Sequence, residues 1–578
     1  MDFTKLSASL ATAYDQYSAD GNLSLTHRAR TLGLVTITET TRPTRAVVFV
    51  RGPLRSGEEL TRLAEAGLEL NETGGAAEEA PRTGIVALDA LDRISSDPAV
   101  GQLIAARRLR PLMDVAPGAV ALPEFVRRSG LTGEGVVIGV VDTGIDPQHP
   151  AFTGRIERIW DQTLPGSGVP EGRYGAELIG EQIRLSRDTD GHGTHVAGIA
   201  AGADATYPGV APGARLVIVK TDLLDAHIAD GVRYCVRVAS ELGMPVVVNL
   251  SLGGHGDPHD GTDPLSQIID AVSGPGRIVV CAAGNEGNDD IHARTQITQG
   301  GQRTITCAAA GPFELNIWYA GADALDIAVA GPSGESTPFQ SIITGGSPVR
   351  QYITGDGRIR IATPGPDPIN GDHNALVLVE PNSSASAPSR LWRLRLRGAS
   401  VSNGQVDAWI LSSPDLPAQF TGRYADDAYK IGSPGAATQA VTAAAYTTKV
   451  SWTDIDGAQR ATGLEPNDIA DFSSEGPRRD EHPKPDVAAP GAMIASALSR
   501  NAHLPRALIL DREHVVMAGT SMASPFVAGV AALLLQRDPN LDPDGLRKQL
   551  RAASSVPGAP PATFDPKWGY GLLSADQL

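Results

Sequence analysis

Four short apolar runs, each ending in small or polar residues, constrain the fold of this chain more than any other feature. The runs are GVVIGVVDTGID from Gly135, RLVIVKTD from Arg215, MPVVVNLSLGG from Met244 and GRIVVCAAGNEG from Gly276. Helix-like stretches such as HIADGVRYCVRVASEL, residues 227–242, separate them. Buried parallel strands that alternate with helices form a doubly wound α/β sheet, in which chemistry gathers at the carboxyl ends of the strands. We therefore expect a doubly wound, mainly parallel α/β sheet.

A smaller domain is expected before this sheet. RAVVFVRG (45–52), TGIVALDA (83–90) and QLIAARRLRPL (102–112) are typical of strands, and GEELTRLAEAGLEL (57–70) and LDRISSDPAV (91–100) are typical of helices. The expected order, β-α-β-β-α-β, suits a small split βαβ, or ferredoxin-like, α+β domain.

Between residues 300 and 425 the alternation of strands and helices disappears. Stretches such as FELNIWYAGADALDIAVAGPSGE and RLWRLRLRGASVSNGQVDAWILS alternate apolar and polar residues between Gly, Pro and Asn turns. This pattern predicts an inserted antiparallel β domain, a sandwich or jelly roll. The chain then divides into an N-terminal extension (1–43), the α+β domain (44–115), the α/β domain in two parts (116–299 and 426–578) and the β insertion (300–425).

Composition limits the class of protein and its partners. The net charge is −17, and the acidic residues are spread along the chain, which favours solubility and argues against a nucleic-acid partner. The three cysteines, Cys235, Cys281 and Cys307, lie among apolar or small residues and predict buried free thiols. The N-terminus has no basic segment followed by an apolar run, so we expect a cytoplasmic or non-classically exported protein unless a leader has been removed.

The stretch GTSMASP, residues 519–525, opens the apolar segment FVAGVAALLLQ. The segment from Met517 to Gln536 is long enough to cross a membrane, but hydroxyl residues and a proline interrupt its first half, and it lacks basic flanks. We expect a buried core helix here and no membrane span.

Polar clusters occur at the ends of four of the expected elements. VVDTGID places Asp142 at a strand end, DGHGTHVAG places His192 and His195 at a helix start, AAGNEG places Asn285 at a strand end, and GTSMASP places Ser521 at a helix start. Acyl transfer needs such a set, because a histidine must take the proton of a serine, a buried carboxylate must fix the tautomer of the histidine, and an amide must meet the oxyanion. Separately, a turn, a loop and a helix cap could explain these residues. Those explanations do not account for their joint occurrence.

The motifs resemble those of the subtilase (subtilisin-like) family of serine proteases. Asp-Thr-Gly at Asp142, His-Gly-Thr-His-Val-Ala-Gly from His192 and Gly-Thr-Ser-Met-Ala-Ser-Pro around Ser521 follow the order of the family, with SLGG and AAGNEG between them. The resemblance covers roughly residues 130–300 and 425–578. It implies Asp142 as the orienting acid, His192 as general base and acid, Ser521 as nucleophile and Asn285 as oxyanion donor. His195 matches a structural histidine of the family.

The resemblance also implies which residues bind the substrate. They are Ser251, Leu252, Gly253 and Gly254 on the strand that pairs with the substrate backbone and lines one wall of the S1 pocket, Ala282, Ala283 and Gly284 on the opposite wall, and Gly432 on the pocket floor. A floor without a side chain implies a deep pocket that suits a large apolar residue.

The layout of the chain is similar to that of the Csp-type subtilases of spore-forming bacteria, which carry an inserted jelly-roll domain. By this resemblance residues 44–115 are a propeptide that assists folding and acts as an intramolecular inhibitor, with self-cleavage near residues 110–120. An ordinary accessory α+β domain is the alternative.

The chemistry that the resemblance implies needs no cofactor. The loop AAGADATYPGVAP (200–212) looks too short for the tight calcium loop of the family, so structural calcium is possible but not assignable. Asp257, His259, Asp260 and Asp263 could form an oxygen-rich metal cluster, and a solvated loop is the alternative. The metal ligands, if any, stay unknown.

We therefore expect a serine endopeptidase that hydrolyses peptide bonds through a Ser-His-Asp triad and an acyl-enzyme and is made as a self-processing zymogen. Its expected partners are protein or peptide substrates and its own propeptide. A second hypothesis is a non-catalytic or tightly restricted subtilase scaffold that acts through its inserted β domain. In a simpler role, that domain would only brace the catalytic domain.

Overall fold

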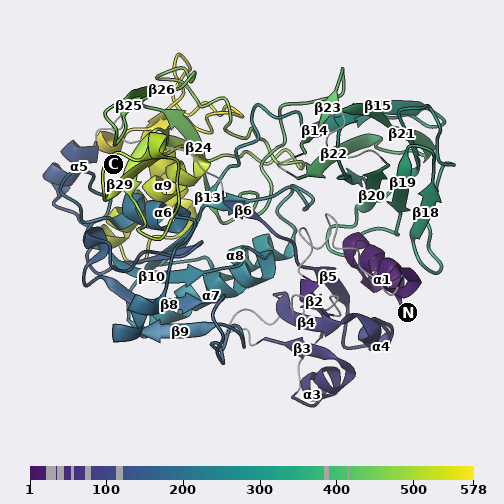
Figure 1. Ribbon diagram of the computed structural model, residues 1–578, viewed down its shortest axis with the longest axis horizontal. Helices are drawn as coiled ribbons and strands as arrows, with labels where there is room; N and C mark the ends of the chain where they lie inside the picture. Colours follow the sequence, from purple (N-terminus) through teal and green to yellow (C-terminus); the bar gives the residue numbers. More distant parts are fainter. Residues whose placement is uncertain are drawn as a thin grey trace.

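A computed structural model describes residues 1–20, 34–35, 45–53, 57–71, 80–111, 122–382, 389–413 and 416–578. It contains a ten-stranded sheet flanked by helices, a small N-terminal sheet with its own helices, and two antiparallel sheets that pack on each other. The N-terminal elements, purple in Figure 1, contact both of the other units.

The ten-stranded sheet has the order β30-β31-β27-β24-β13-β11-β7-β10-β8-β9. Its strands are β7 (Val137–Asp142), β8 (Ile156–Asp161), β9 (Ala176–Ile179), β10 (Arg215–Lys220), β11 (Val246–Leu250), β13 (Arg277–Ala282), β24 (Val441–Thr447), β27 (Val487–Ala492), β30 (Ser554–Ser555) and β31 (Leu572–Leu573). All neighbours in this order are parallel except at the two edges, where β9 pairs with β8 and β30 pairs with β31 in antiparallel fashion. The expected mainly parallel α/β sheet is therefore confirmed.

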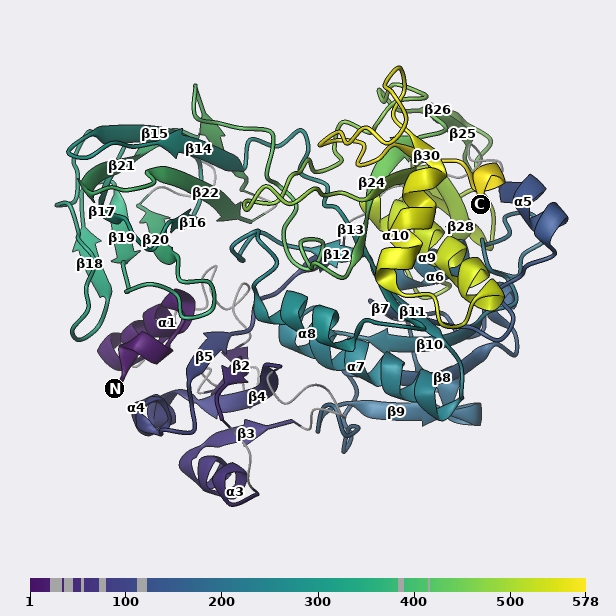
Figure 2. The ribbon, with the colours of Figure 1, turned by 180° about the vertical axis from the view of Figure 1, so that it is seen from behind.

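Helices cover both faces of this sheet. In β7, Ile138 and Val140 join the apolar cluster around α6 (His192–Ala201) and α9 (Thr520–Arg537). Val137 and Val141 join the cluster around α7 (Asp225–Glu241) and α8 (Pro264–Val272), which run side by side in Figure 2. Successive side chains of a strand point to opposite faces, so a strand with both faces covered is apolar throughout.

Short elements complete the α/β unit. They are α5 (Leu122–Ser129), α10 (Pro543–Ala552) and the strand pairs β25 (Ser451–Thr453) with β26 (Gln459–Ala461), β28 (Ile494–Ala497) with β29 (His514–Met517), and β12 (Leu252–Gly253) with β6 (Arg110–Pro111).

The N-terminal unit contains a five-stranded sheet and helices. Its elements are α1 (Ala8–Asp20), β1 (Leu34–Val35), β2 (Arg45–Arg51), α3 (Gly57–Ala66), β3 (Leu68–Leu70), β4 (Arg82–Ala87), α4 (Leu91–Ser96) and β5 (Gln102–Ala105). The helix expected over 57–70 ends at Ala66, because Gly67 adopts a φ of +106° and the chain continues as β3. The strand expected over 102–112 is two strands, and only β5 belongs to this sheet.

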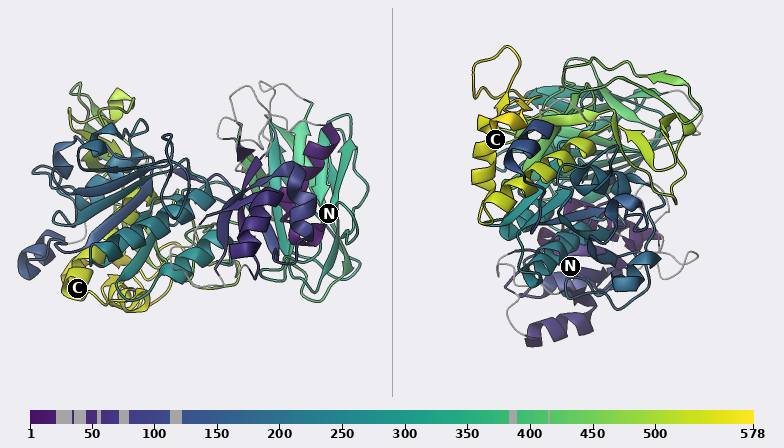
Figure 3. Two further views of the ribbon diagram at one scale, coloured as in Figure 1. Left: turned by 90° about the horizontal axis from the view of Figure 1, so that it is seen from below. Right: turned by 90° about the vertical axis from the view of Figure 1, so that its left-hand side faces the viewer.

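Strand β2 is apolar on both faces because each face has a different neighbour. Ala46, Val48 and Val50 pack within the N-terminal unit. Val47 and Phe49 join the apolar cluster that contains α7 and α8. Figure 3 shows the N-terminal unit beside both the α/β unit and the inserted strands. The N-terminal unit is thus docked by an apolar interface.

The inserted unit consists of a six-stranded sheet, β14-β22-β16-β20-β19-β18, and a four-stranded sheet, β17-β21-β15-β23. The strands are β14 (His292–Gln296), β15 (Gln302–Ala309), β16 (Phe313–Tyr319), β17 (Ala324–Ala330), β18 (Val349–Ile353), β19 (Gly357–Ala362), β20 (His373–Pro381), β21 (Arg390–Ser400), β22 (Gln405–Ser412) and β23 (Ala418–Thr421). Side chains from both sheets share one apolar core. Because β14 pairs with β22, this unit begins before the expected residue 300.

No helix in the part of the chain that the structure describes is long and apolar enough to cross a membrane. In the candidate segment, α9 is buried from Thr520 to Leu535, as expected for a core helix. Cys235, Cys281 and Cys307 are buried and free, also as expected.

Gly139 in β7 lets α7 approach the sheet closely. A Cβ at this position would lie 2.8 Å from the sulfur and 2.9 Å from the Cβ of Cys235. We expect Gly139→Ala to lower the free energy of unfolding by about 1–3 kcal/mol, and with it the Tm measured by calorimetry, because the added methyl group overpacks the core. Gly463→Ala, at a glycine with nothing within 4 Å, is the control. Equal Tm values for the two variants would contradict the tight contact.

Candidate active site

Asp142 and His192 are in direct contact at the carboxyl edge of the sheet. Asp142 is the last residue of β7, and its Oδ1 lies 2.7 Å from Nδ1 of His192. The two residues are 1% and 0% exposed, respectively. A buried carboxylate at Nδ1 keeps a proton on that nitrogen, which leaves Nε2 of the imidazole as the atom that can accept another proton.

Asp188 builds the turn that presents His192, although the sequence analysis did not single it out. Its Oδ1 accepts hydrogen bonds from N of Gly191 and Oγ1 of Thr143, both at 2.9 Å. Its Oδ2 accepts from N and Oγ1 of Thr194, at 2.9 and 2.6 Å. An acidic residue shortly before a helix start, where orphan N–H groups need acceptors, is the signal that could have identified it.

Ser521 is the second residue of α9 and is tied to the strand end next to Asp142. Its Oγ donates to the carbonyl oxygen of Ser251 at 2.9 Å, and Oγ of Ser251 donates to the carbonyl oxygen of Ser521 at 2.8 Å. Ser251 directly follows β11, which pairs with β7. The hydroxyl of Ser521 and the Asp142–His192 pair therefore lie at adjacent strand ends, where the start of α9 favours negative charge.

The side chain of Asn285 is oriented by Thr520, a second residue that the sequence analysis missed. Oδ1 of Asn285 accepts hydrogen bonds from N and Oγ1 of Thr520, both at 2.9 Å. Since the amide oxygen is occupied, the amide nitrogen is the end left to donate. A hydroxyl residue directly before the expected nucleophile was the available signal.

His195 has a structural environment. Its Nε2 lies 2.9 Å from the carbonyl oxygen of Ile494, and burial lowers its pKa to about 3. The imidazole therefore stays neutral near neutral pH, which fits the structural role that the sequence analysis assigned to it.

The segment that follows β5, residues 106–111, is called here the tail, and its strand β6 lies beside the strand that follows Ser251. β6 pairs antiparallel with β12, with Arg110 opposite Gly253 and Pro111 opposite Leu252. With this strand in place, Ser521 and His192 are both 0% exposed. Most of the region expected for cleavage, residues 112–120, lies outside the described residues.

The residues expected to line the substrate pocket lie together. The segment 251–254, which contains β12, contacts the residue after Gly432: N of Gly254 donates a hydrogen bond to the carbonyl oxygen of Ser433 at 3.1 Å. The segment Ala282–Gly284 continues β13, and N of Gly284 donates to Oγ1 of Thr520 at 3.1 Å. One expected wall is therefore hydrogen-bonded to the expected floor, and the other is hydrogen-bonded to the start of α9.

Gly432 does not form an empty floor. A Cβ on this residue would lie 2.2 Å from the carbonyl oxygen of Gly254, 3.0 Å from Oδ1 of Asp257 and 3.1 Å from Nε2 of His259. The glycine is needed because these polar atoms approach its Cα closely. A side chain at position 432 would clash with these atoms, and the deep apolar pocket stays a prediction.

The loop after the substrate strand, residues 255–263, is buried, so the alternative of a solvated loop is wrong. Asp257, His259, Asp260 and Asp263 are only 1%, 0%, 7% and 3% exposed. Among the residues that the structure describes, no group of three or more His, Cys, Asp or Glu side chains is arranged to hold a metal ion.

The inserted unit covers this loop. Nδ2 of Asn316 donates to the carbonyl oxygens of His255 and Asp257, at 3.0 and 2.9 Å. The ring of Trp409 stacks on that of His259, with the centroids 3.8 Å apart and the planes at 4°. These contacts fix the loop that lies against Gly432.

Comparisons with known proteins find similarity to one family. The model described as "Subtilase family" matches residues 133–347 and 399–571. Serine protease AprX of Bacillus subtilis (strain 168) is 25% identical over 462 residues, which cover 77% of this chain and 67% of AprX. Subtilisin-like protease SBT1.4 of Arabidopsis thaliana is 27% identical over 498 residues, which cover 74% of this chain and 59% of that protease. The chain thus spans about three-fifths to two-thirds of the length of these relatives.

The fold is also that of a solved subtilase. The CspB protease of Clostridium perfringens superposes with a TM-score of 0.65 at 24% identity, covering 79% of this chain and 96% of that structure. The family match spans both parts of the α/β unit and omits residues 348–398 of the inserted unit. The chain therefore belongs to the subtilase family of subtilisin-like serine proteases.

Proposed function

We propose that the chain is a serine endopeptidase that hydrolyses peptide bonds through a Ser-His-Asp triad. The observation that carries this proposal is the 2.7 Å contact of Asp142 with His192 at the sheet edge where Ser521 lies in the first turn of α9. Family membership supports the reaction class. The positions of the three side chains support their individual roles.

In the proposed reaction, Asp142 holds the ring of His192 so that Nε2 accepts the proton of Ser521. The hydroxyl must first leave the carbonyl oxygen of Ser251, to which it donates at 2.9 Å. Oγ then forms a bond to the carbonyl carbon of the substrate, and His192 passes the proton to the departing amine. Water repeats these transfers on the acyl-enzyme and frees Ser521.

The negative charge that develops on the substrate oxygen needs donors. The amide nitrogen of Asn285 is one, because Thr520 already occupies the amide oxygen. The N–H groups at the start of α9 add a favourable dipole at the same point. Pre-positioned donors of this kind stabilise the transition state more than the ground state.

We further propose that residues 44–115 are a propeptide and that the inserted unit is a jelly-roll domain. The antiparallel pairing of β6 with β12 supports the first assignment, because an inhibitory tail would take the place of a substrate backbone there. The contacts of Asn316 and Trp409 with loop 255–263 favour a bracing role for the inserted unit. A non-catalytic scaffold is the competing hypothesis.

The register of β6 predicts the bond that is cleaved. Arg110 lies opposite Gly253 and Pro111 opposite Leu252, so the next residue in sequence would fall opposite Ser251, whose carbonyl oxygen is bonded to Ser521. We expect intact-mass analysis of freshly purified protein to show a fragment that ends at Leu112 and its complement. Ser521→Ala should remain whole. An uncut wild-type chain would contradict the zymogen hypothesis, and a cut elsewhere would contradict this register.

Labelling with a fluorophosphonate probe distinguishes the peptidase hypothesis from the hypothesis of a non-catalytic scaffold. We expect the probe to label the processed wild-type protein on Ser521, because His192 activates that hydroxyl, and to leave Ser521→Ala unlabelled. Mass spectrometry of the labelled peptide locates the probe. Absence of labelling in the wild-type protein would support the scaffold.

Asn285→Ala should lower kcat for a peptide substrate roughly 100- to 1000-fold while KM changes little, because the lost donor acts in the transition state. Asn288→Ala is the matched control, since Asn288 is exposed in the same loop. A similar loss in both variants would assign the effect to the loop conformation and not to the amide.

A further inference from the structure

Arg107 enters the α/β unit three residues before the strand pair of the tail. Its N donates to Oδ1 of Asp225 at 2.7 Å, and its carbonyl oxygen accepts from N of Asp225 at 2.8 Å. Its Nε lies 3.4 Å from Oδ2 of the same carboxylate. Its side chain runs along Gly256, where a Cβ would lie 2.8 Å from Cδ and 3.1 Å from Nη1 of Arg107.

Three buried carboxylates, Asp225, Asp257 and Asp263, interact electrostatically with Arg107 and are called here the acidic cradle. They are 3%, 1% and 3% exposed. Burial raises the pKa of Asp225 to about 6 and raises the pKa of Asp257 and Asp263, while the charge of Arg107 lowers the pKa of all three. Burying carboxylates without a cation is costly, so the cradle favours a positive group.

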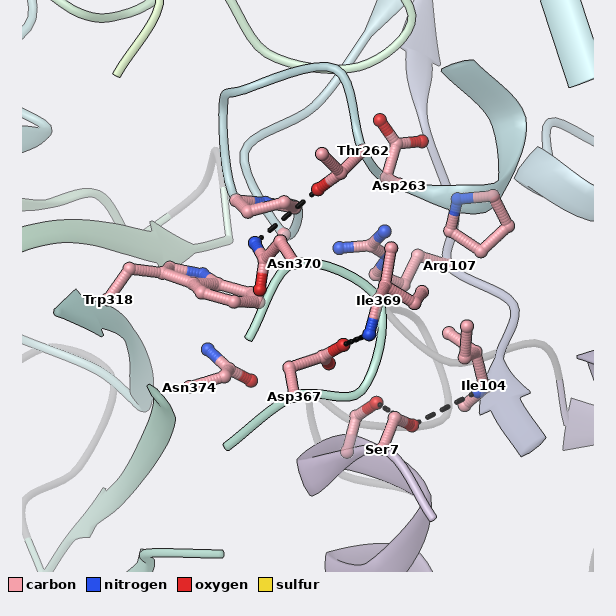
Figure 4. A pocket seen from close by; sticks show the side chains of 15 residues that line it. Ser7, Ile104, Arg107, Thr262, Asp263, Trp318, Asp367, Ile369, Asn370 and Asn374 are labelled. Atoms are coloured by element: carbon pink, nitrogen blue, oxygen red, sulfur yellow. Dashed lines mark hydrogen bonds between the residues drawn. The ribbon is translucent and has the colours of Figure 1, made fainter. Parts of the chain in front are cut away.

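Two carboxylate oxygens of the acidic cradle accept no hydrogen bond within the part of the chain that the structure describes. Oδ1 of Asp257 and Oδ2 of Asp263 are buried and have no hydrogen-bond partner among the described residues. Figure 4 shows that Asp263 and Arg107 line one pocket, together with Asp367 and Asn370 of the inserted unit. Arg107 is already in place, so it acts on Asp257 and Asp263 through its charge and not through a hydrogen bond to these two oxygens.

A guanidinium fits this arrangement better than a metal ion. The residues that the structure describes provide no group of three or more His, Cys, Asp or Glu side chains that could hold a metal ion. A planar guanidinium has five N–H donors and can serve acceptors that lie apart.

The neighbouring arginine provides a contrast. Arg108 is exposed, and its backbone forms a bridge to Leu224. Leu109 follows, with its N bonded to the carbonyl oxygen of Leu223 at 2.7 Å and its side chain 3.0 Å from the Cβ position of Gly254. The extended tail therefore turns only one of the two adjacent arginines into the cradle.

We propose that the acidic cradle is a substrate subsite that selects a basic side chain, arginine above lysine, six residues before the cleaved bond. The position follows from the register proposed above, in which Leu112 precedes the cleaved bond, so this inference rests on the proposed peptidase function. The tail occupies the subsite before processing. An extended protein substrate with arginine at that position occupies it afterwards.

Peptide substrates test the selection directly. The processed enzyme is given AARRLRPLMDVA, the sequence of residues 105–116, and two versions with alanine in place of the first or the second arginine. We expect kcat/KM to fall roughly 10- to 100-fold for the first version, as for a lost charged hydrogen bond, and less than about 3-fold for the second. Lysine in place of the first arginine should retain part of the effect.

The enzyme variant Asp225→Asn should remove the difference between the first two peptides, because the amide keeps the shape of the carboxylate without its charge. Asp263→Asn serves as a second variant if the first does not fold. A preference that survives both changes would overturn the proposal, and so would loss of the preference on addition of millimolar calcium, which would show a metal site.

A second measurement does not depend on catalysis. In the uncleaved Ser521→Ala chain, hydrogen exchange of the Ala106 and Leu109 amides reports how firmly the tail is held. We expect Arg107→Ala to speed this exchange at least about 10-fold, and Arg108→Ala to leave it within about 3-fold. Equal amide exchange rates in the two variants would overturn the proposal that the acidic cradle holds Arg107. An inactive enzyme that still shows the difference would contradict only the peptidase function.

Discussion

The candidate active site depends on the burial of α9 against the middle of the large sheet. Every residue from Thr520 to Leu535 is buried, and Gly529 permits an approach in which a Cβ would lie only 2.4 Å from Val210. Because each residue of a helix turns the chain by about 100°, a slip of one residue would rotate Ser521 away from Ser251. Close packing of small side chains thus fixes the direction of the hydroxyl.

The N-terminal unit uses the same principle at its own interface. Strand β2 has apolar residues on both faces, so the unit cannot fold with one face in water without exposing Val47 and Phe49. The tail that follows β5 is then held by backbone hydrogen bonds to β12 and to residues 223–225. An apolar interface therefore holds the N-terminal unit in position, and backbone hydrogen bonds hold the tail.

Much of the α/β unit could be predicted from the sequence, because buried parallel strands give uninterrupted apolar runs and polar residues follow them directly. Asp142 and Asn285 were identifiable for that reason, and Ser521 was identifiable because small and hydroxyl residues open an apolar helix. The resemblance implied an inhibitory propeptide and a strand that pairs with substrate, but the register of β6 against β12 could not be predicted, because two residues carry no periodicity. The burial of loop 255–263 was missed because its polar composition resembles that of a solvated turn, whereas its partners Asn316 and Trp409 come from another unit.

A continuous stack of rings joins the substrate loop to the inserted unit. The centroids of His255, His259, Trp409 and His292 follow one another at 5.2, 3.8 and 4.8 Å. Excision of the insertion would leave one face of the His259 ring bare and remove the Asn316 amide that donates to two loop carbonyl groups. Deletion of the inserted unit would therefore require redesign of loop 255–263 at the same time. For protein engineering, the loop and the inserted unit form a single module.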